Sequence, residues 1–160
     1  MTPDPGREAA SSVQPAVDDR TALTVYFDGA CPLCSAEIGH YAGLAGSERL
    51  CFVDVSAPGA EVGPDLPRTS ALRRFHVRRA DGRLLSGAPA FVAIWETLPA
   101  WRPAARLARL PGVVSLLELG YRLFLPARPL LSRLAAALGA RPMRNASGEV
   151  AENEAGSQRA

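Results

Sequence analysis

The sequence predicts an α/β domain in which a β-α-β unit is followed by a β-β-α unit and then by additional C-terminal helices. Three observations support this fold class. Short β-branched and aromatic runs end at turn residues, and segments with apolar side chains at helical spacing lie between them. The chain has 160 residues, of which 48% are apolar, so it is long enough to bury a single core.

The β-α-β unit is predicted over the first part of the domain. Residues 23–27 are β-branched and aromatic and end at Asp-Gly, as a strand entering a loop does. Pro32 is favoured at the first helical position, which makes Cys31 the N-cap, and the apolar spacing extends this helix to about Ala45. Residues 50–55 form a second apolar strand.

The β-β-α unit follows a loop rich in Gly and Pro. Thr69 is expected to cap a short helix that runs to Arg74. Residues 75–79 and 83–86 flank Asp-Gly at 81–82, which predicts a hairpin because both turn residues tolerate positive φ. Residues 89–98 have the apolar stripe of an amphipathic helix.

The C-terminal part is predicted to be a helical extension that begins at about residue 103. It contains about two helical segments, separated at Pro111-Gly112 and interrupted by Pro126 and Pro129. No stretch reaches the roughly 20 apolar residues of a transmembrane helix.

Both ends of the chain are expected to be disordered tails. Residues 1–21 are polar and rich in Pro, Ala and Ser, and residues 141–160 have almost no large apolar side chain, which leaves 22–140 as the folded domain. Residues 1–21 also lack the basic and apolar regions of a secretory signal, so we expect a cytoplasmic protein. In that reducing compartment a Cys-x-x-Cys pair is more often catalytic or metal-binding than structural.

The Cys-Pro-Leu-Cys sequence at 31–34 is the main chemical feature. A thiolate at a helix N-cap can accept hydrogen bonds from the unpaired N–H groups of the first turn and lies at the positive end of the helix dipole, so we expect a lowered pKa for Cys31. Cys34 lies one turn further along the helix and can reach Cys31. The pattern predicts thiol-disulfide exchange, with Cys31 as the nucleophile and Cys34 as the resolving thiol. This chemistry needs no cofactor beyond the dithiol.

The sequence around the cysteines resembles a known family. Residues 28–34, Asp-Gly-Ala-Cys-Pro-Leu-Cys, match the Asp-x-x-Cys-x-x-Cys signature of the DCC family of thiol-disulfide oxidoreductases. The resemblance covers about residues 23–125 and also includes Phe52-Val53-Asp54 and His76-Val77. It implies a thioredoxin-like fold, a redox pair formed by the two cysteines, and Asp28 as the third signature residue. The substrate would be a protein or small molecule that carries a disulfide or thiol, while the electron donor and the oligomeric state are not indicated.

One departure from thioredoxins concerns the region opposite the dithiol. Thioredoxins have a cis-proline ahead of the third strand, whereas residues 73–76 here contain no proline. We therefore hypothesise that His76 faces the dithiol instead. Asp28 has two interpretations: a base that deprotonates Cys34 through water, or a cap for its own loop.

Metal binding is an alternative for the same cysteines. Cys31, Cys34, His40 and Cys51 are enough ligands for a tetrahedral zinc site. Against it, six residues separate Cys34 from His40, which places the two on different sides of the helix. Cys51 lies within an apolar strand, so we expect it in the buried core rather than as a third redox thiol.

Arginine is the only basic side chain apart from histidine, and it gathers in two regions. The cluster around residues 73–83 is expected to be a solvated surface. Residues 98–144 carry eight Arg against one acid, Glu118, interleaved with leucines. Helices of this kind either close the domain or lie on a membrane surface, which leaves a second hypothesis: a redox-inactive adaptor that docks to a membrane or protein partner. The net charge of +2 gives no indication of nucleic-acid binding.

Overall fold

The two apolar runs predicted as the first strands pair in parallel. In the computed structural model, which describes residues 22–142, β1 (Leu23–Phe27) and β2 (Leu50–Asp54) are connected through α1 (Pro32–Ala42) and a short 3-10 turn, η1 (Ser47–Arg49). Helix α1 begins where the sequence predicts and ends three residues early, because the chain turns at Gly43. The predicted tails lie outside the described residues, except for positions 141 and 142.

The predicted hairpin is formed by β3 (His76–Arg79) and β4 (Leu84–Ser86), and β3 pairs antiparallel with β1. Its turn differs from the prediction, because Gly82 alone takes a positive φ, of 84°. The Gly82 N–H donates to the Arg79 carbonyl at 2.9 Å, and the Asp81 carboxylate accepts the Arg83 N–H at 2.9 Å. A three-residue hairpin loop with one glycine in the left-handed region matches the twist of the two strands, so no second loop residue needs a positive φ.

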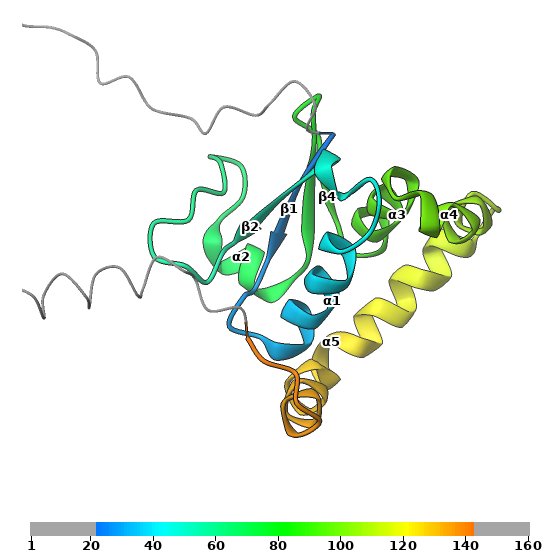
Figure 1. The fold of residues 1–160 in the computed structure, drawn as a ribbon. Helices are drawn as coiled ribbons and strands as arrows, with labels where there is room; N and C mark the ends of the chain where they lie inside the picture. Colours follow the sequence, from blue (N-terminus) through cyan, green and yellow to red (C-terminus); the bar gives the residue numbers. More distant parts are fainter. Residues whose placement is uncertain (1–21, 143–160) are drawn as a thin grey trace, which may run out of the picture.

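The helices cover both faces of the sheet, whose strand order is β2-β1-β3-β4 (Figure 1). Helices α1 and α3 (Ala88–Thr97) pack on one face, over a core that includes Val25, Ile38 and Ile94. Helix α2 (Arg68–Arg73) covers part of the other face, where Tyr26, Val55 and Leu66 are buried, and its N-cap is Pro67 rather than the predicted Thr69. This β-α-β plus β-β-α arrangement is a thioredoxin-like α/β fold.

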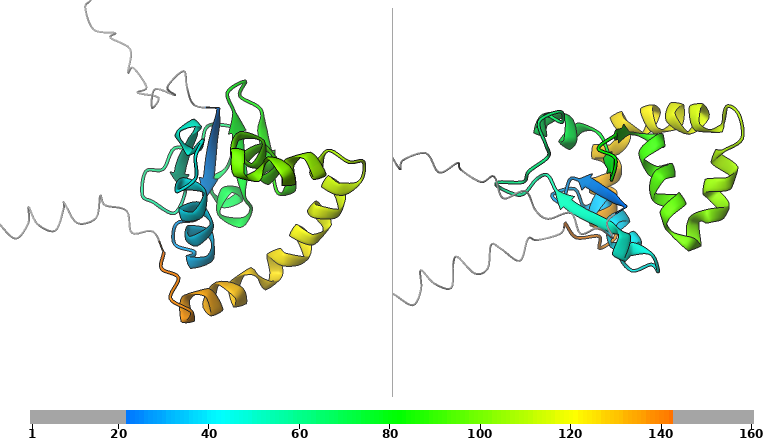
Figure 2. Two further views of the ribbon diagram at one scale, coloured as in Figure 1. Left: turned by 45° about the vertical axis from the view of Figure 1, so that its right-hand side comes forward. Right: turned by 90° about the horizontal axis from the view of Figure 1, so that it is seen from above.

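The C-terminal extension consists of a 3-10 turn, η2 (Pro99–Trp101), and helices α4 (Arg102–Ala108) and α5 (Val113–Ala137). The predicted interruption at Pro126 and Pro129 is wrong, since α5 runs continuously through both. Side-chain contacts to the domain on either side of the prolines hold the helix together and outweigh the lost N–H donors. Figure 2 shows α5 following a curved path along the outside of the domain, where it contacts α1 and α3.

None of the described helices alone has the length and apolar character of a membrane span. Pro99–Ala108 and Val113–Ala137 meet both criteria only as a pair, and that pair is bent by 104° at its break.

The prediction that Cys51 is buried in the core is wrong. Cys51 is exposed, and it lies on β2, an edge strand, where its register partner is Thr24. Leu50 faces the main core, so the next residue must face the opposite side of the sheet. Helix α2 covers only the other end of that side, around Val55, and leaves Cys51 open to solvent.

Candidate active site

The two cysteines lie at the junction between β1 and α1. Cys31 is the N-cap residue and is 7% exposed, and Cys34 is half-buried in the first turn of the helix. Both are free thiols, and they approach each other to 3.2 Å. The loop is held by the Ser35 hydroxyl, which donates to the Gly29 carbonyl at 3.0 Å. The dithiol is therefore preorganised for forming a disulfide between residues 31 and 34.

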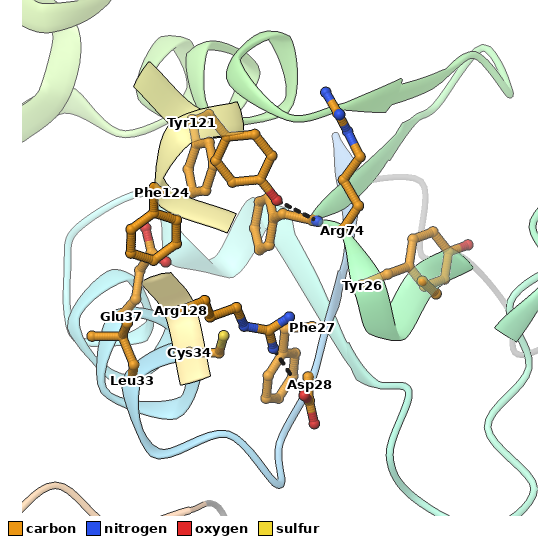
Figure 3. A pocket seen from close by; sticks show the side chains of 13 residues that line it. Tyr26, Phe27, Asp28, Leu33, Cys34, Glu37, Arg74, Tyr121, Phe124 and Arg128 are labelled. Atoms are coloured by element: carbon orange, nitrogen blue, oxygen red, sulfur yellow. Dashed lines mark hydrogen bonds and ion pairs between the residues drawn. The ribbon is translucent and has the colours of Figure 1, made fainter. Parts of the chain in front are cut away.

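Helix α5 completes the site from the far end of the chain. The Arg128 guanidinium donates to the Asp28 carboxylate at 2.8 Å (Figure 3) and to the Leu72 carbonyl at 3.0 Å. The Arg128 and Asp28 side chains are only 17% and 20% exposed. One turn further along α5, the Ser132 hydroxyl lies 3.5 Å from the Cys31 Sγ. A cation and a hydroxyl donor from α5 thus face the dithiol.

The groups around the two cysteines shift their pKa values in opposite directions. Burial alone would raise the pKa of Cys31, but hydrogen bonds from Ser132, from the backbone and thiol of Cys34, and from Arg128 outweigh it, so the pKa is lowered. Burial raises the pKa of Cys34 to about 12, and its hydrogen bond to Cys31 and the charge of that thiolate add to the shift. Cys31 is therefore the more acidic of the two thiols.

The lowered pKa of Cys31 agrees with the expectation, but its main cause differs. We expected the first turn of α1 to stabilise the thiolate, yet the Cys31 side chain makes no capping hydrogen bond of good geometry. The strongest lowering comes from Ser132, with the Cys34 backbone N–H second. The Ser132 side chain on α5 therefore lowers the pKa of Cys31 more than the Cys34 N–H in the first turn of α1 does.

Two hollows adjoin the dithiol. A cavity of about 40 Å³ beside Cys34 is mostly apolar, and Phe91 is among the residues that line it. Tyr121 and Phe124 also line it (Figure 3). It has room for roughly three water molecules at about 10–15 Å³ each. An open groove of about 380 Å³ runs beside Cys31 and is lined also by Arg73 and Ser132. The larger opening therefore lies next to the more acidic thiol.

A half-buried carboxyl group lines the cavity beside Cys34. Glu37 lies one turn after Cys34 on α1, and burial raises the pKa of its carboxyl. The Tyr41 hydroxyl donates to Glu37 at 3.2 Å and accepts the indole N–H of Trp95 at 3.2 Å. A carboxylate with a raised pKa is a better proton acceptor than an exposed one.

Contacts at the first half of α5 hold the helix against the sheet and α3. The Glu118 carboxylate is bound by Arg74, accepts the Ala88 N–H at 3.0 Å, and forms an ion pair with Arg122 at 3.1 Å. The Tyr121 hydroxyl accepts the Phe75 N–H at 2.9 Å. These contacts fix the position of α5. They therefore also fix the positions of Arg128 and Ser132, which face the dithiol.

Gly29, inside the Asp-x-x-Cys segment, is required by a close approach of Asp54. A Cβ at residue 29 would lie 2.2 Å from the Asp54 carboxylate. That carboxylate cannot move freely, because it accepts the Gly29 N–H at 2.9 Å and both the N–H and the hydroxyl of Ser56 at 2.8 and 2.6 Å. We expect Gly29→Ala to lower the free energy of unfolding by about 2–3 kcal/mol, measured by urea denaturation.

Gly39→Ala is the matched control. Gly39 lies in the exposed middle of α1, and a Cβ there meets nothing within 4 Å. Alanine should stabilise the protein by up to about 1 kcal/mol at this position. Equal effects of the two substitutions would contradict the close-approach argument.

Two groups of residues that the sequence singled out are not brought to the dithiol. His76 is buried at the start of β3 with its Nδ1 2.7 Å from the Arg74 carbonyl oxygen, and it lines neither hollow. Among residues 22–142 no three His, Cys, Asp or Glu side chains lie together as metal ligands. His40 instead lies edge-to-face with Trp101, with ring centroids 6.0 Å apart, and the four predicted zinc ligands do not converge.

Asp28 does reach the site, and it makes the hydrogen bond to its own loop that the loop-capping interpretation requires. Its carboxylate accepts the Ala30 N–H at 3.1 Å and the Arg128 guanidinium on its other oxygen. Its action as a base stays a hypothesis.

The sequence interpretation missed Arg128, Ser132 and Glu37. For Arg128 the one available signal was its position between two prolines within an otherwise amphipathic helix.

The comparisons with known proteins agree with this geometry. The model of one family, described as DCC1-like thiol-disulfide oxidoreductase, matches residues 25–134. That range includes the dithiol, the sheet and the part of α5 that carries Arg128 and Ser132. Neither the curated proteins nor the solved structures yielded a match.

Proposed function

The chain belongs to the DCC1-like thiol-disulfide oxidoreductase family, and we propose that Cys31 is its attacking thiolate and Cys34 its resolving thiol. The observation that carries this assignment is the opposite shift of the two acidities. The pKa of Cys31 is lowered and the pKa of Cys34 is raised to about 12. Only a thiolate attacks a disulfide, so the first attack falls to Cys31.

The reaction has two exchange steps. The Cys31 thiolate attacks one sulfur of a substrate disulfide, forms a mixed disulfide and releases the other sulfur as a thiolate. Cys34 then gives up its proton and attacks the Cys31 Sγ, which releases the second substrate thiolate. The substrate gains two electrons, and the protein is left with a disulfide between residues 31 and 34. Run in reverse, the same steps oxidise a dithiol substrate.

The mixed disulfide itself activates Cys34. In the reduced protein the Cys31 thiolate raises the pKa of Cys34 through both its hydrogen bond and its charge. Once Cys31 is bonded to substrate, that charge is gone, while the nearby Arg128 cation still lowers the pKa of Cys34. The second thiol therefore becomes more acidic at the step that needs it.

The substrate is proposed to enter along the groove beside Cys31. This groove is open to solvent and is lined by the apolar Leu72, Leu125 and Pro129 and by Arg73. It would accept the apolar flanks of a disulfide, and the exposed Arg73 would bind a carboxylate next to it. The substrate class remains a molecule that carries a thiol or disulfide.

Two carboxyl groups line the cavity beside Cys34 and are candidates for its proton acceptor. The Asp28 carboxylate is engaged by the Arg128 guanidinium. Burial raises the pKa of the Glu37 carboxyl, which lines the same cavity, so Glu37 is suited to accept a proton there. We propose proton transfer to Glu37 through cavity water, with Asp28 holding Arg128.

The pH dependence of alkylation tests the assignment. We expect the iodoacetamide reaction at Cys31, followed by peptide mass spectrometry, to have its midpoint below 9.0, the ordinary thiol value, while Cys34 stays unreactive across neutral pH. In concentrated urea the contacts with Ser132 and Arg128 are lost, so the Cys31 midpoint should return to the ordinary value.

A redox titration completes the test. In glutathione buffers of increasing oxidation, the protein should lose two thiols together as a disulfide forms between residues 31 and 34. A Cys31 midpoint at or above 9.0, with no such disulfide, would remove the basis for the proposed exchange and favour a redox-inactive adaptor.

A further inference from the structure

The outer side of α5 carries a row of exposed leucines. The leucine stripe consists of Leu116, Leu119, Leu123, Leu130 and Leu134, each more than half exposed. At roughly 100° per residue the five fall within about 60° of one another around the helix. Leu107 and Leu110, at the end of α4 and just after it, are exposed as well. In the described part of the chain every exposed large apolar side chain lies between residues 107 and 138.

The stripe lies on the side of α5 that faces away from the domain. Glu118, Tyr121, Arg128 and Ser132 all contact other elements, so they define the inner side of the helix. The stripe lies about 150° around the helix from Arg128. No residue of α5 is buried, although the helix has 25 residues. Nothing within residues 22–142 therefore covers the stripe.

The net charge around the leucine stripe is positive. Between residues 98 and 142 the chain has seven Arg and one acid, Glu118. That acid is turned inward and held by Arg74 and the Ala88 N–H. Arg106 and Arg133 are exposed and make no side-chain hydrogen bond or ion pair within the described residues. Arg109 pairs with Glu96 at 3.4 Å, and Arg128 pairs with Asp28 on the inner side of α5.

We propose that the α4–α5 face, formed by the leucine stripe with Leu107, Leu110 and the flanking arginines, docks on an anionic lipid surface. The leucines would enter the boundary between headgroups and acyl chains, and the arginines would bind lipid phosphates. Guanidinium groups suit phosphate because they can donate two parallel hydrogen bonds. A second copy of the chain is a poorer occupant, since pairing two such faces would bring like charges together.

Docking in this way leaves the dithiol accessible. Arg128 and Ser132 lie on the inner side of α5, opposite the leucine stripe, and the groove beside Cys31 opens along that inner side. A bound protein therefore keeps Cys31 on the side of α5 that faces away from the lipid. The docking inference does not depend on the redox activity of the cysteines.

Vesicle co-sedimentation of the reduced full chain tests the proposal. We expect binding to vesicles of phosphatidylcholine mixed with phosphatidylglycerol at low salt, and at least about tenfold weaker binding to phosphatidylcholine alone. Salt near 1 M, where the Debye length is about 3 Å, should weaken binding to a similar extent. The triple variant Leu116→Ser, Leu123→Ser, Leu130→Ser should lower the affinity by about 100-fold or more, because three buried side chains are lost.

Paired arginine variants provide the matched control. Arg106→Gln with Arg133→Gln should weaken binding about tenfold, whereas Arg79→Gln with Arg83→Gln, which removes two exposed arginines from the β3–β4 hairpin, should have little effect. Circular dichroism and the pH profile of Cys31 alkylation should be unchanged in all of these variants. Absence of sedimentation with anionic vesicles at low salt would overturn the proposal. So would a lipid-free dimer that the triple variant converts to a monomer, because a second copy would then cover the stripe.

Discussion

Replacing Cys31 with serine is expected to lower the rate of thiol-disulfide exchange by on the order of 10³-fold or more, because it removes the attacking thiolate. Cys34→Ser should have a different effect. Its Cys31 still attacks, but nothing resolves the product, so the mixed disulfide should accumulate and be visible by non-reducing mass spectrometry. The substrate bonded to Cys31 in that trapped species can then be identified.

Cys51→Ser is the control for this pair. Cys51 is exposed on the edge strand β2 and lines neither of the two hollows at the dithiol. Its replacement should leave the rate within about twofold, as surface substitutions usually do. If Cys34→Ser turned over normally and Cys51→Ser trapped the intermediate, the resolving role would belong to Cys51.

Arg128→Gln is expected to change both the acidity of Cys31 and the stability of the protein. The guanidinium lowers the pKa of both cysteines, so its loss should move the pH–rate profile upward. Each pKa unit lowers the thiolate fraction about tenfold below the midpoint, and exchange near neutral pH should slow accordingly. The Asp28 carboxylate would also lose its cation at a largely buried position, which should cost about 1–3 kcal/mol of the free energy of unfolding.

Two further variants separate a positioning role from a merely structural one. Arg133→Gln removes an exposed arginine from the same helix, so it should leave both the pH profile and the stability unchanged. Arg128→Lys retains the charge but loses the paired donors, and it should recover part of the pKa shift. At a pH well above the midpoint, the Arg128→Gln rate should approach that of the wild type. A loss of rate that is uniform across pH would show that Arg128 acts only on folding.

The local elements of the fold could be predicted because their signals lie within a few residues. The junction from β1 to α1 is encoded by an apolar run, Asp28-Gly29 and Pro32, all within ten positions. The β3–β4 hairpin is placed correctly by its Asp-Gly turn. The turn type could not be predicted, because the sequence does not reveal that the loop holds three residues rather than two.

The contribution of α5 to the site could not be predicted from local patterns. The contacts of Arg128 with Asp28 and of Ser132 with Cys31 join residues 100 and 101 positions apart. Periodicity identifies a basic, apolar helix but does not show which of its arginines turns inward. The helical interruption predicted at Pro126 failed for the same reason, since tertiary contacts on both sides of the prolines override propensity.

The exposure of Cys51 could not be predicted from local patterns either. An apolar strand with period two indicates two faces, but the pattern does not tell whether a helix covers the whole of each face. Whether the end of β2 is covered depends on where the short helix α2 packs, and the loop before α2 contains no periodic signal.

The distance along the chain between the cysteines and Arg128 has a consequence for biosynthesis. A ribosome completes the Asp28–Cys34 segment about 100 residues before it adds Arg128 and Ser132. Until those two side chains arrive, the nascent dithiol lacks the hydrogen bonds and the cation that make Cys31 acidic, and it reacts as an ordinary thiol pair. Helix α5 therefore supplies the groups that make an earlier segment reactive, and a nascent chain that has not yet reached Arg128 carries its cysteines in their less reactive form.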